Sequence, residues 1–180
     1  MDWRLFVAIN NLAGQWHSID LVMRYLALYG PFVLLLPLLY LWFGSRGENL
    51  VEERLTVLRA MTAAALALGF NVLINACYYR PRPFMHHKVK LLIPPSQDAS
   101  FPSDHAAGAW GLTWSMRAKK VHYGMMALSF LLMLARVYVG VHYPLDVLGG
   151  AVVGVGASII VENLWPYVMP WAKRLALMLP

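Results

Sequence analysis

Residues 22–43 read VMRYLALYGPFVLLLPLLYLWF, a nearly continuous apolar run. A helix needs about 20 such residues to cross the hydrocarbon core of a bilayer, so this run is long enough to span a membrane. Pro31 and Pro37 lie inside it and predict kinks. Four further apolar runs follow, at 60–79, 104–116, 121–140 and 145–164. The pattern predicts an all-α, polytopic integral membrane bundle with about five to six spans.

The composition also indicates a membrane protein. Hydrophobic residues make up 59% of the 180 residues and charged residues only 13%, about half the usual charged share of soluble domains. The length predicts one domain, 1–180. Residues 3–16 and the tail after 164 have amphipathic patterns, which predict helices lying in the membrane interface. The start of the chain lacks the basic segment and short apolar core of a cleavable signal peptide.

The order of the runs predicts which loops share a face of the membrane. The loop 80–102 and the turn at His142 are separated by two spans, so both should open on the same face. The other face carries eight basic residues: Arg46, Arg54, Arg59, Arg117, Lys119, Lys120, Lys173 and Arg174. Cytoplasmic loops are enriched in such residues, so the face with the His142 turn should be extracytoplasmic. Four cations on that face run against this tendency, which is explained if they serve a substrate: Arg80, Arg82, Lys88 and Lys90. The net charge of +6 is explained by topology and phosphate binding, without nucleic acid.

The turn at His142 carries the first candidate chemistry. His142 precedes Pro144, a residue suited to a helix start, and Asp146 lies in the first turn of that helix. A carboxylate bonded to one imidazole nitrogen would fix the tautomer and leave the other nitrogen free to attack. Arg136 ends the preceding apolar run, where it is either a phosphate ligand or an anchor in the headgroup region.

A second candidate is the segment FPSDH, residues 101–105. Ser103 or Asp104 is expected to cap the helix that follows, and the free N–H groups of that helix would face an anion. His105 in the first turn is placed to protonate a leaving oxygen. The alternative is an ordinary helix cap beside a surface histidine.

A third candidate is the segment RPRPF, residues 80–84. Arginine has a planar fork of donors that fits phosphate oxygens, although Arg80 and Arg82 would also suit a basic loop beside a membrane. Acidic residues are sparse near the three segments, and adjacent histidines such as His86 and His87 rarely chelate one metal. We therefore predict chemistry without a metal or other cofactor.

Together, RPRPF, FPSDH and the closing VGVHYPLDVLGG at 139–150 resemble the type 2 phosphatidic acid phosphatase superfamily, which also includes vanadium haloperoxidases. The strings look most like those of bacterial undecaprenyl-diphosphatases of the bacitracin-resistance type. The resemblance covers about 75–150. It implies that His142 is the nucleophile and forms a phosphohistidine, that Asp146 orients and activates it, and that His105 is first an acid and then a base.

The resemblance also implies a phosphate-binding set, and one member departs from the family pattern. The set comprises Arg82, Ser103, Arg136, Asn75 and Asp104. The family has a lysine seven residues before the arginine, where this chain has Asn75. Arg80, Lys88 or Lys90 would replace the missing cation or bind a second phosphate, or Asn75 would donate a neutral hydrogen bond.

The activity implied is hydrolysis of undecaprenyl pyrophosphate to undecaprenyl phosphate and phosphate. That reaction recycles the lipid carrier for cell-wall synthesis and gives bacitracin resistance, with the active site on the outer face of the bacterial cell membrane. The partners implied are a polyprenyl pyrophosphate lipid and the bilayer. One alternative is a lipid monophosphate phosphatase acting on phosphatidic acid, phosphatidylglycerophosphate or a lipid A phosphate. Another is a non-catalytic lipid-phosphate binder, which would not need His142, Asp146 and His105 at these spacings.

Overall fold

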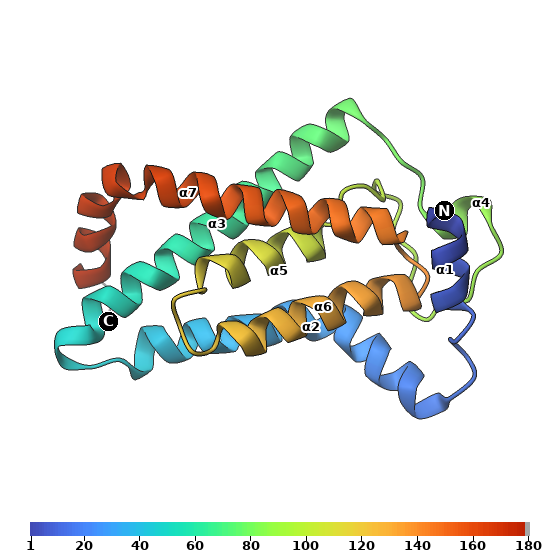
Figure 1. Ribbon diagram of the computed structural model, residues 1–180, viewed down its shortest axis with the longest axis horizontal. Helices are drawn as coiled ribbons and strands as arrows, with labels where there is room; N and C mark the ends of the chain where they lie inside the picture. Colours follow the sequence, from blue (N-terminus) through green and yellow to red (C-terminus); the bar gives the residue numbers. More distant parts are fainter. Residues whose placement is uncertain (179–180) are drawn as a thin grey trace.

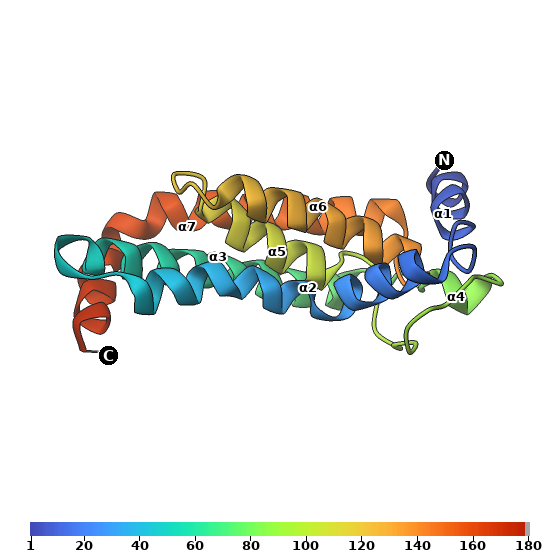
Figure 2. The ribbon, with the colours of Figure 1, turned by 90° about the horizontal axis from the view of Figure 1, so that it is seen from below.

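The computed structural model describes residues 1–178, and these form helices joined by turns and loops without any β-strand. The α-helices are α1 (Asp2–Asn10), α2 (His17–Gly44), α3 (Leu50–Cys77), α4 (Pro83–His86), α5 (Asp104–Ser115), α6 (His122–Tyr138) and α7 (Pro144–Met178). Helices α2, α3, α5, α6 and α7 run along the long axis as an elongated bundle (Figure 1). The short helices α1 and α4 lie at one end of it (Figure 2). The all-α prediction is confirmed.

The number of membrane spans is only roughly as predicted. Within residues 1–178, the segments 17–44, 47–77 and 144–178 are long and apolar enough to cross a membrane. The 17 residues of α6 reach about 26 Å, and the 12 residues of α5 about 18 Å. The shorter α5 packs mainly against α3 and α7, and most of its residues are buried. It is therefore enclosed by protein and does not need to match the thickness of the bilayer.

Three helices extend beyond the apolar runs that predict them. Helix α2 begins at His17 and α3 at Leu50, because charged residues at a helix start do not interrupt it. Glu52 and Glu53 lie in the first turn of α3, where the helix dipole favours negative charge. Helix α7 continues to Met178 through Pro166 and Pro170. Its final turns bend away from the bundle axis (Figure 1), and the Arg54 guanidinium donates a hydrogen bond to the Ala176 carbonyl at 2.8 Å.

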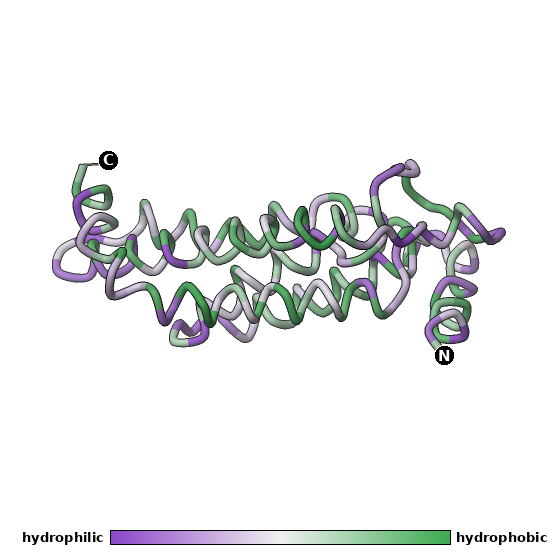
Figure 3. The backbone as a smooth tube through the Cα atoms, turned by 90° about the horizontal axis from the view of Figure 1, so that it is seen from above, coloured by the Kyte–Doolittle hydropathy of each residue, from purple (hydrophilic) through white to green (hydrophobic). Residues whose placement is uncertain are grey.

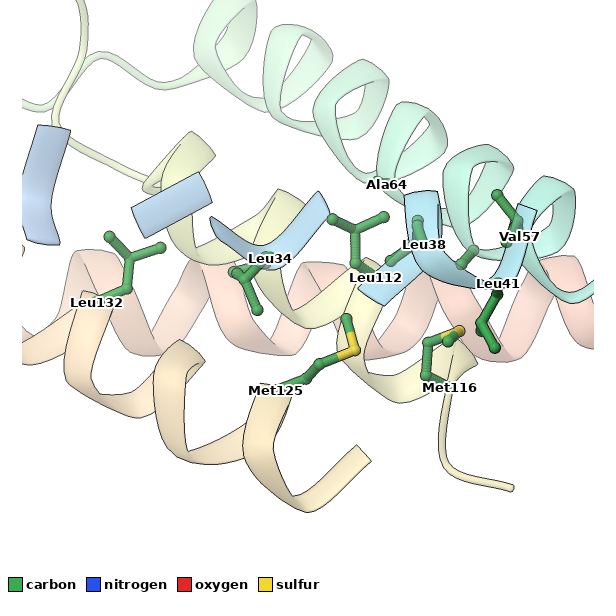
Figure 4. Packing of buried hydrophobic residues seen from close by; sticks show 11 residues of the cluster. Leu34, Leu38, Leu41, Val57, Ala64, Leu112, Met116, Met125 and Leu132 are labelled. Carbon is green, nitrogen blue, oxygen red and sulfur yellow. The ribbon is translucent and has the colours of Figure 1, made fainter. Parts of the chain in front are cut away.

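Apolar residues fill the middle of the bundle and polar residues gather towards its two ends (Figure 3). The largest cluster of buried side chains joins four helices, and these side chains point towards one another (Figure 4). Its labelled members are Leu34, Leu38, Leu41, Val57, Ala64, Leu112, Met116, Met125 and Leu132. This packing fixes the relative positions of α2, α3, α5 and α6.

Helices α5 and α7 approach closely because small residues line their contact. A Cβ added at Gly154 would overlap the Ala107 carbonyl and lie 2.8 Å from the Gly111 nitrogen. The hydroxyls of Ser115 and Ser158 also bond across the two helices at 2.7 Å. Small residues and hydroxyl hydrogen bonds are the usual means by which helices associate in membranes.

The connections fall at the two ends of the bundle in the order predicted. The segment 78–103 and the turn 139–143 lie at the same end as α1, whereas 45–49, 116–121 and the end of α7 lie at the opposite end (Figure 1). The three sequence segments with candidate chemistry therefore meet at one end of the molecule.

A substitution pair on α7 tests this close packing. Gly154→Ala should lower the free energy of unfolding by about 1–3 kcal/mol, because the new methyl group forces α5 and α7 apart. At Gly156 an added Cβ has no neighbour within 4 Å, so Gly156→Ala should be neutral or slightly stabilising. Thermal unfolding of both variants in one detergent measures the difference. Equal melting temperatures for the two variants would contradict the close contact.

Candidate active site

A polar cavity of about 320 Å³ opens at the end of the bundle that carries α1. It lies where the loop after α3, the first turn of α5, the end of α6 and the turn before α7 meet. Its polar lining residues are Arg82, Ser96, Asp98, Asp104, His105, Arg136 and His142. Residues from all three candidate segments are thus brought to one cavity.

His142 lies in the turn between α6 and α7 and is 2% exposed. Its Nδ1 lies 2.9 Å from the Ser100 carbonyl oxygen, which can only accept a hydrogen bond, so Nδ1 carries the proton. Its Nε2 lies 3.2 Å from Nη1 of Arg82 and 3.5 Å from Nη2 of Arg136. Because a guanidinium can only donate, the Nε2 lone pair faces the two arginines at the cavity.

The charge state of His142 follows from these surroundings. Burial, followed by the positive charges of Arg136 and Arg82, lowers the pKa of His142 well below its ordinary value of 6.5. The imidazole is therefore neutral at pH 7. A neutral ring with its proton on Nδ1 has its nucleophilic nitrogen directed at the arginines.

The arrangement at Asp146 differs from the direct pair that the sequence predicts. Its Oδ2 lies 3.8 Å from Nδ1 of His142, too far for a hydrogen bond. That oxygen instead accepts hydrogen bonds from the Ser100 hydroxyl at 2.5 Å and the Tyr143 backbone N–H at 2.8 Å. Ser100 therefore bridges the two residues, with its carbonyl on His142 and its hydroxyl on Asp146.

Arg82 and Arg136 are both buried beside His142. Arg82 donates to the Asp98 carbonyl at 3.2 Å and to the Asp98 carboxylate at 2.9 Å, and it also reaches the Val141 carbonyl at 3.1 Å. Arg136 donates to the Ala27 carbonyl at 3.3 Å. The Nε of Arg136 is buried and has no hydrogen-bond partner among residues 1–178. A donor of this kind can bond an anion that enters the cavity.

Ser103 occupies the N-cap position of α5, but its side chain does not make the capping hydrogen bond expected from the sequence. Its Oγ is buried and, within the described chain, unpaired. The Asp104 carboxylate instead accepts a hydrogen bond from the side chain of Asn71 at 2.6 Å. His105 follows in the first turn of α5 and lines the cavity. The start of α5 thus combines a free hydroxyl with unpaired backbone N–H groups.

The cations proposed for a second phosphate are placed elsewhere. Arg80 pairs with Asp2 and Asp146, at 2.6 Å in each case. Lys90 donates from its ammonium to the carbonyls that follow α1, at 2.9 and 2.6 Å, and Lys88 is exposed. None of the three is among the residues that line the cavity in the described chain.

The position of the missing family lysine also lies outside the cavity lining. Asn75 is near the end of α3 and does not line the cavity in the part of the chain described. Asn71, one helical turn earlier, is fully buried and holds Asp104. Sequence reasoning missed Asn71, although a polar residue inside an apolar run was a usable signal. It also missed Ser100, a loop serine with no such signal.

A second, apolar groove of about 300 Å³ adjoins the polar cavity and shares Asp104 and His105 with it. Side chains of α2, α3 and α5 form its walls. Its apolar lining includes Pro31, Phe32, Leu35, Met61, Leu68 and Gly108. A polar cavity that continues into an apolar groove fits a ligand with a charged head and a hydrocarbon tail.

Comparison with known proteins agrees with this geometry. The chain is 37% identical over 158 residues to undecaprenyl-diphosphatase BcrC of Bacillus subtilis, covering 86% of this chain and 79% of that protein. It is 31% identical over 159 residues to the bacitracin transport permease protein BcrC of Bacillus licheniformis, covering 87% and 76%. The crystal structure of LpxE from Aquifex aeolicus superposes with a TM-score of 0.73 at 28% identity, covering 89% of this chain and 94% of LpxE.

The family is also recognised directly, because residues 56–170 match the PAP2 superfamily. This match includes α5, α6 and most of α3 and α7, and with them every segment that lines the polar cavity except α2. The protein is a membrane-embedded, helical member of the PAP2 superfamily.

Proposed function

We propose that the protein is a membrane lipid-pyrophosphate phosphatase that hydrolyses undecaprenyl pyrophosphate to undecaprenyl phosphate and phosphate. The observation that carries the proposal is the pair of buried arginines beside the His142 Nε2. Arg82 and Arg136 lie beside that nitrogen, and the Arg136 Nε and the Ser103 Oγ are unpaired within residues 1–178. The similarity to a protein named undecaprenyl-diphosphatase supports the choice of substrate.

The reaction proceeds through two displacements at phosphorus. First, the His142 Nε2 attacks the terminal phosphorus, and the bond to the lipid phosphate breaks while His105 protonates the leaving oxygen. Water then attacks the phosphohistidine, His105 takes the proton of that water, and the P–N bond breaks to release phosphate. Arg82, Arg136 and Ser103 bind the phosphoryl oxygens in both steps, so one set of donors stabilises both transition states.

The lipid tail lies in the apolar groove between α2, α3 and α5. The groove shares His105 with the polar cavity, so a pyrophosphate in the cavity places its first isoprene unit at the groove. A tail that occupies the groove enters from the side of the bundle, within the bilayer.

The catalytic end of the bundle faces the outside of a bacterial cell membrane. The eight basic residues that favour a cytoplasmic location belong to the loops of the opposite end and to the parts of α3 and α7 that lie there. The tendency of such residues to remain in the cytoplasm supports this orientation. Lipid pyrophosphate produced on the outer surface would then reach the cavity directly.

A lipid monophosphate phosphatase is the second candidate, and one observation favours it. Arg80 and Lys90 are engaged with other partners, so the cavity contains the donors for one phosphoryl group without the extra cations expected for a second. Substrates of this class include phosphatidic acid.

Phosphate release from two lipids distinguishes these candidates. Purified protein in detergent should release phosphate from undecaprenyl pyrophosphate at least about tenfold faster than from phosphatidic acid, a difference of about 1.4 kcal/mol in the barrier. His142→Ala should abolish both activities. Faster release from phosphatidic acid would move the assignment to the monophosphate class, and no release from either lipid would leave a non-catalytic binder.

The acidic limb of the pH profile reports on His142. The nucleophile must be neutral, and its pKa is lowered, so kcat/KM should fall only as the pH drops below 6.5 towards that lower pKa. Arg136→Gln removes a charge that depresses the pKa and should shift this limb upwards by about one pH unit. Arg117→Gln, at the opposite end of the bundle, is the control and should leave the limb in place. A limb that Arg136→Gln leaves unmoved would contradict this assignment.

A bulky side chain in the groove tests the path of the tail. Gly108→Leu should raise KM for undecaprenyl pyrophosphate about tenfold, because the leucine fills space that the tail needs. Turnover of a short-chain pyrophosphate should change less than about twofold. Gly69→Leu is the matched control on α3, since an added Cβ there has no neighbour within 4 Å. Equal effects of Gly108→Leu on the long and short substrates would reject this groove as the tail site.

A further inference from the structure

The carboxylate of Asp146 is linked to the amino-terminal helix through Arg80. Arg80 donates from Nη1 to Oδ1 of Asp146 and from Nη2 to Oδ2 of Asp2, with both distances 2.6 Å. The other oxygen of Asp2 accepts a hydrogen bond from the Leu145 backbone N–H at 3.0 Å. Asp2 therefore contacts both Arg80, which binds Asp146, and Leu145, which precedes Asp146 in the chain.

Arg80 is fixed in this position by its surroundings. Its guanidinium lies over the ring of Tyr143, 4.3 Å from the ring centre, and its own carbonyl accepts a hydrogen bond from the Ser100 N–H at 2.7 Å. Ser100 is the residue that contacts both His142 and Asp146. Arg80 thus holds two parts of the nucleophile site at once, and both of its terminal nitrogens are already engaged.

Helix α1 is packed firmly against this region. Phe6 is 1% exposed and lies 5.6 Å from Tyr143 between ring centres. Asn10 donates to the carbonyls of Tyr138 and Lys90, at 2.8 Å in each case. In Figure 2, α1 stands across the end of the bundle, beside the turn before α7. The helix therefore contacts both sides of the turn that carries His142.

We propose that Asp2 and Arg80 are positioning residues for the nucleophile, so that the amino-terminal helix is part of the catalytic apparatus. This inference rests on the proposed function. A connected path of hydrogen bonds runs from Asp2 through Arg80, Asp146 and Ser100 to His142. The path fixes the Asp146 carboxylate 3.8 Å behind the imidazole without a direct hydrogen bond between them.

The charges of this group explain why Asp2 is needed. The imidazole gains positive charge when Nε2 bonds to phosphorus, and a negative charge behind it stabilises that state. By itself, the positive charge of Arg80 would cancel the negative charge of Asp146, leaving the pair neutral. Asp2 adds a second carboxylate, so the three side chains together carry one negative charge. Asp2 thereby lets Arg80 orient Asp146 while the group stays negative.

Substitutions that change the charge in opposite directions test this inference. Asp2→Asn keeps the shape of the side chain but leaves the group neutral, so kcat should fall about tenfold with KM unchanged. Adding Arg80→Gln restores one negative charge but removes the contact between Arg80 and Asp146, so the double variant should recover part of the lost kcat. The protein should carry any purification tag at its carboxyl end, away from Asp2.

A structural role for Asp2 predicts a different pattern. If Asp2 only anchored α1, adding Arg80→Gln to Asp2→Asn would leave kcat equal to or below that of Asp2→Asn alone. Such a result overturns the inference. An unchanged kcat in Asp2→Asn also overturns the inference.

Tyr138→Phe is the control for a purely structural effect. The Tyr138 hydroxyl bonds the Leu12 carbonyl at 3.2 Å and Asp20 at 2.7 Å, so it stabilises the turn after α1, away from Asp146. The substitution should lower the melting temperature and leave kcat within about twofold; a loss of kcat equal to that of Asp2→Asn would also overturn the inference.

The wild-type protein and His142→Ala separate this inference from the proposed function. If the wild-type protein releases no phosphate, or if His142→Ala releases as much as the wild type, the proposed function and the positioning pair are both rejected. Release that depends on His142 but is insensitive to Asp2→Asn would reject only the positioning pair.

Discussion

The close contact between α5 and α7 determines the geometry of the site. Gly154 and Gly111 meet where a single methyl group would not fit, and the Ser103 N–H bonds the Asp146 carbonyl at 3.0 Å at the end of the same contact. The start of α5 carries Ser103 and His105, and the start of α7 follows His142. A shift between the two helices would therefore change the distance between the nucleophile and the groups proposed to bind and protonate its substrate.

Much of the fold and part of the site could be predicted from the sequence. Apolar runs predict helices because their length matches a bilayer, and the number of runs between two loops predicts which loops share an end of the bundle. This reasoning brings His142, His105 and Arg82 together without a structure. Helix ends were less accurate, as at His17 and Leu50, because charged residues outside the membrane continue a helix as readily as they end one.

The contacts around Asp146 could not be predicted in the same way. The spacing of His142 and Asp146 suggests a direct pair, but a backbone carbonyl and a hydroxyl from the loop residue Ser100 come between them. The placement of Arg80 depends on Asp2, which is 78 residues away in the chain. No local sequence pattern predicts such a contact, so the sequence alone suggests that Arg80 binds the substrate.

The most direct test of the central claim is to trap the covalent intermediate. Protein mixed with substrate labelled in its terminal phosphoryl group is quenched within the first turnover at high pH, where a phosphorus–nitrogen bond survives, and the labelled peptide is identified by mass spectrometry. A phosphoryl group on Nε2 of His142 is the expected result. A label on another residue, or hydrolysis that proceeds without any labelled protein in that first turnover, would contradict nucleophilic attack by His142.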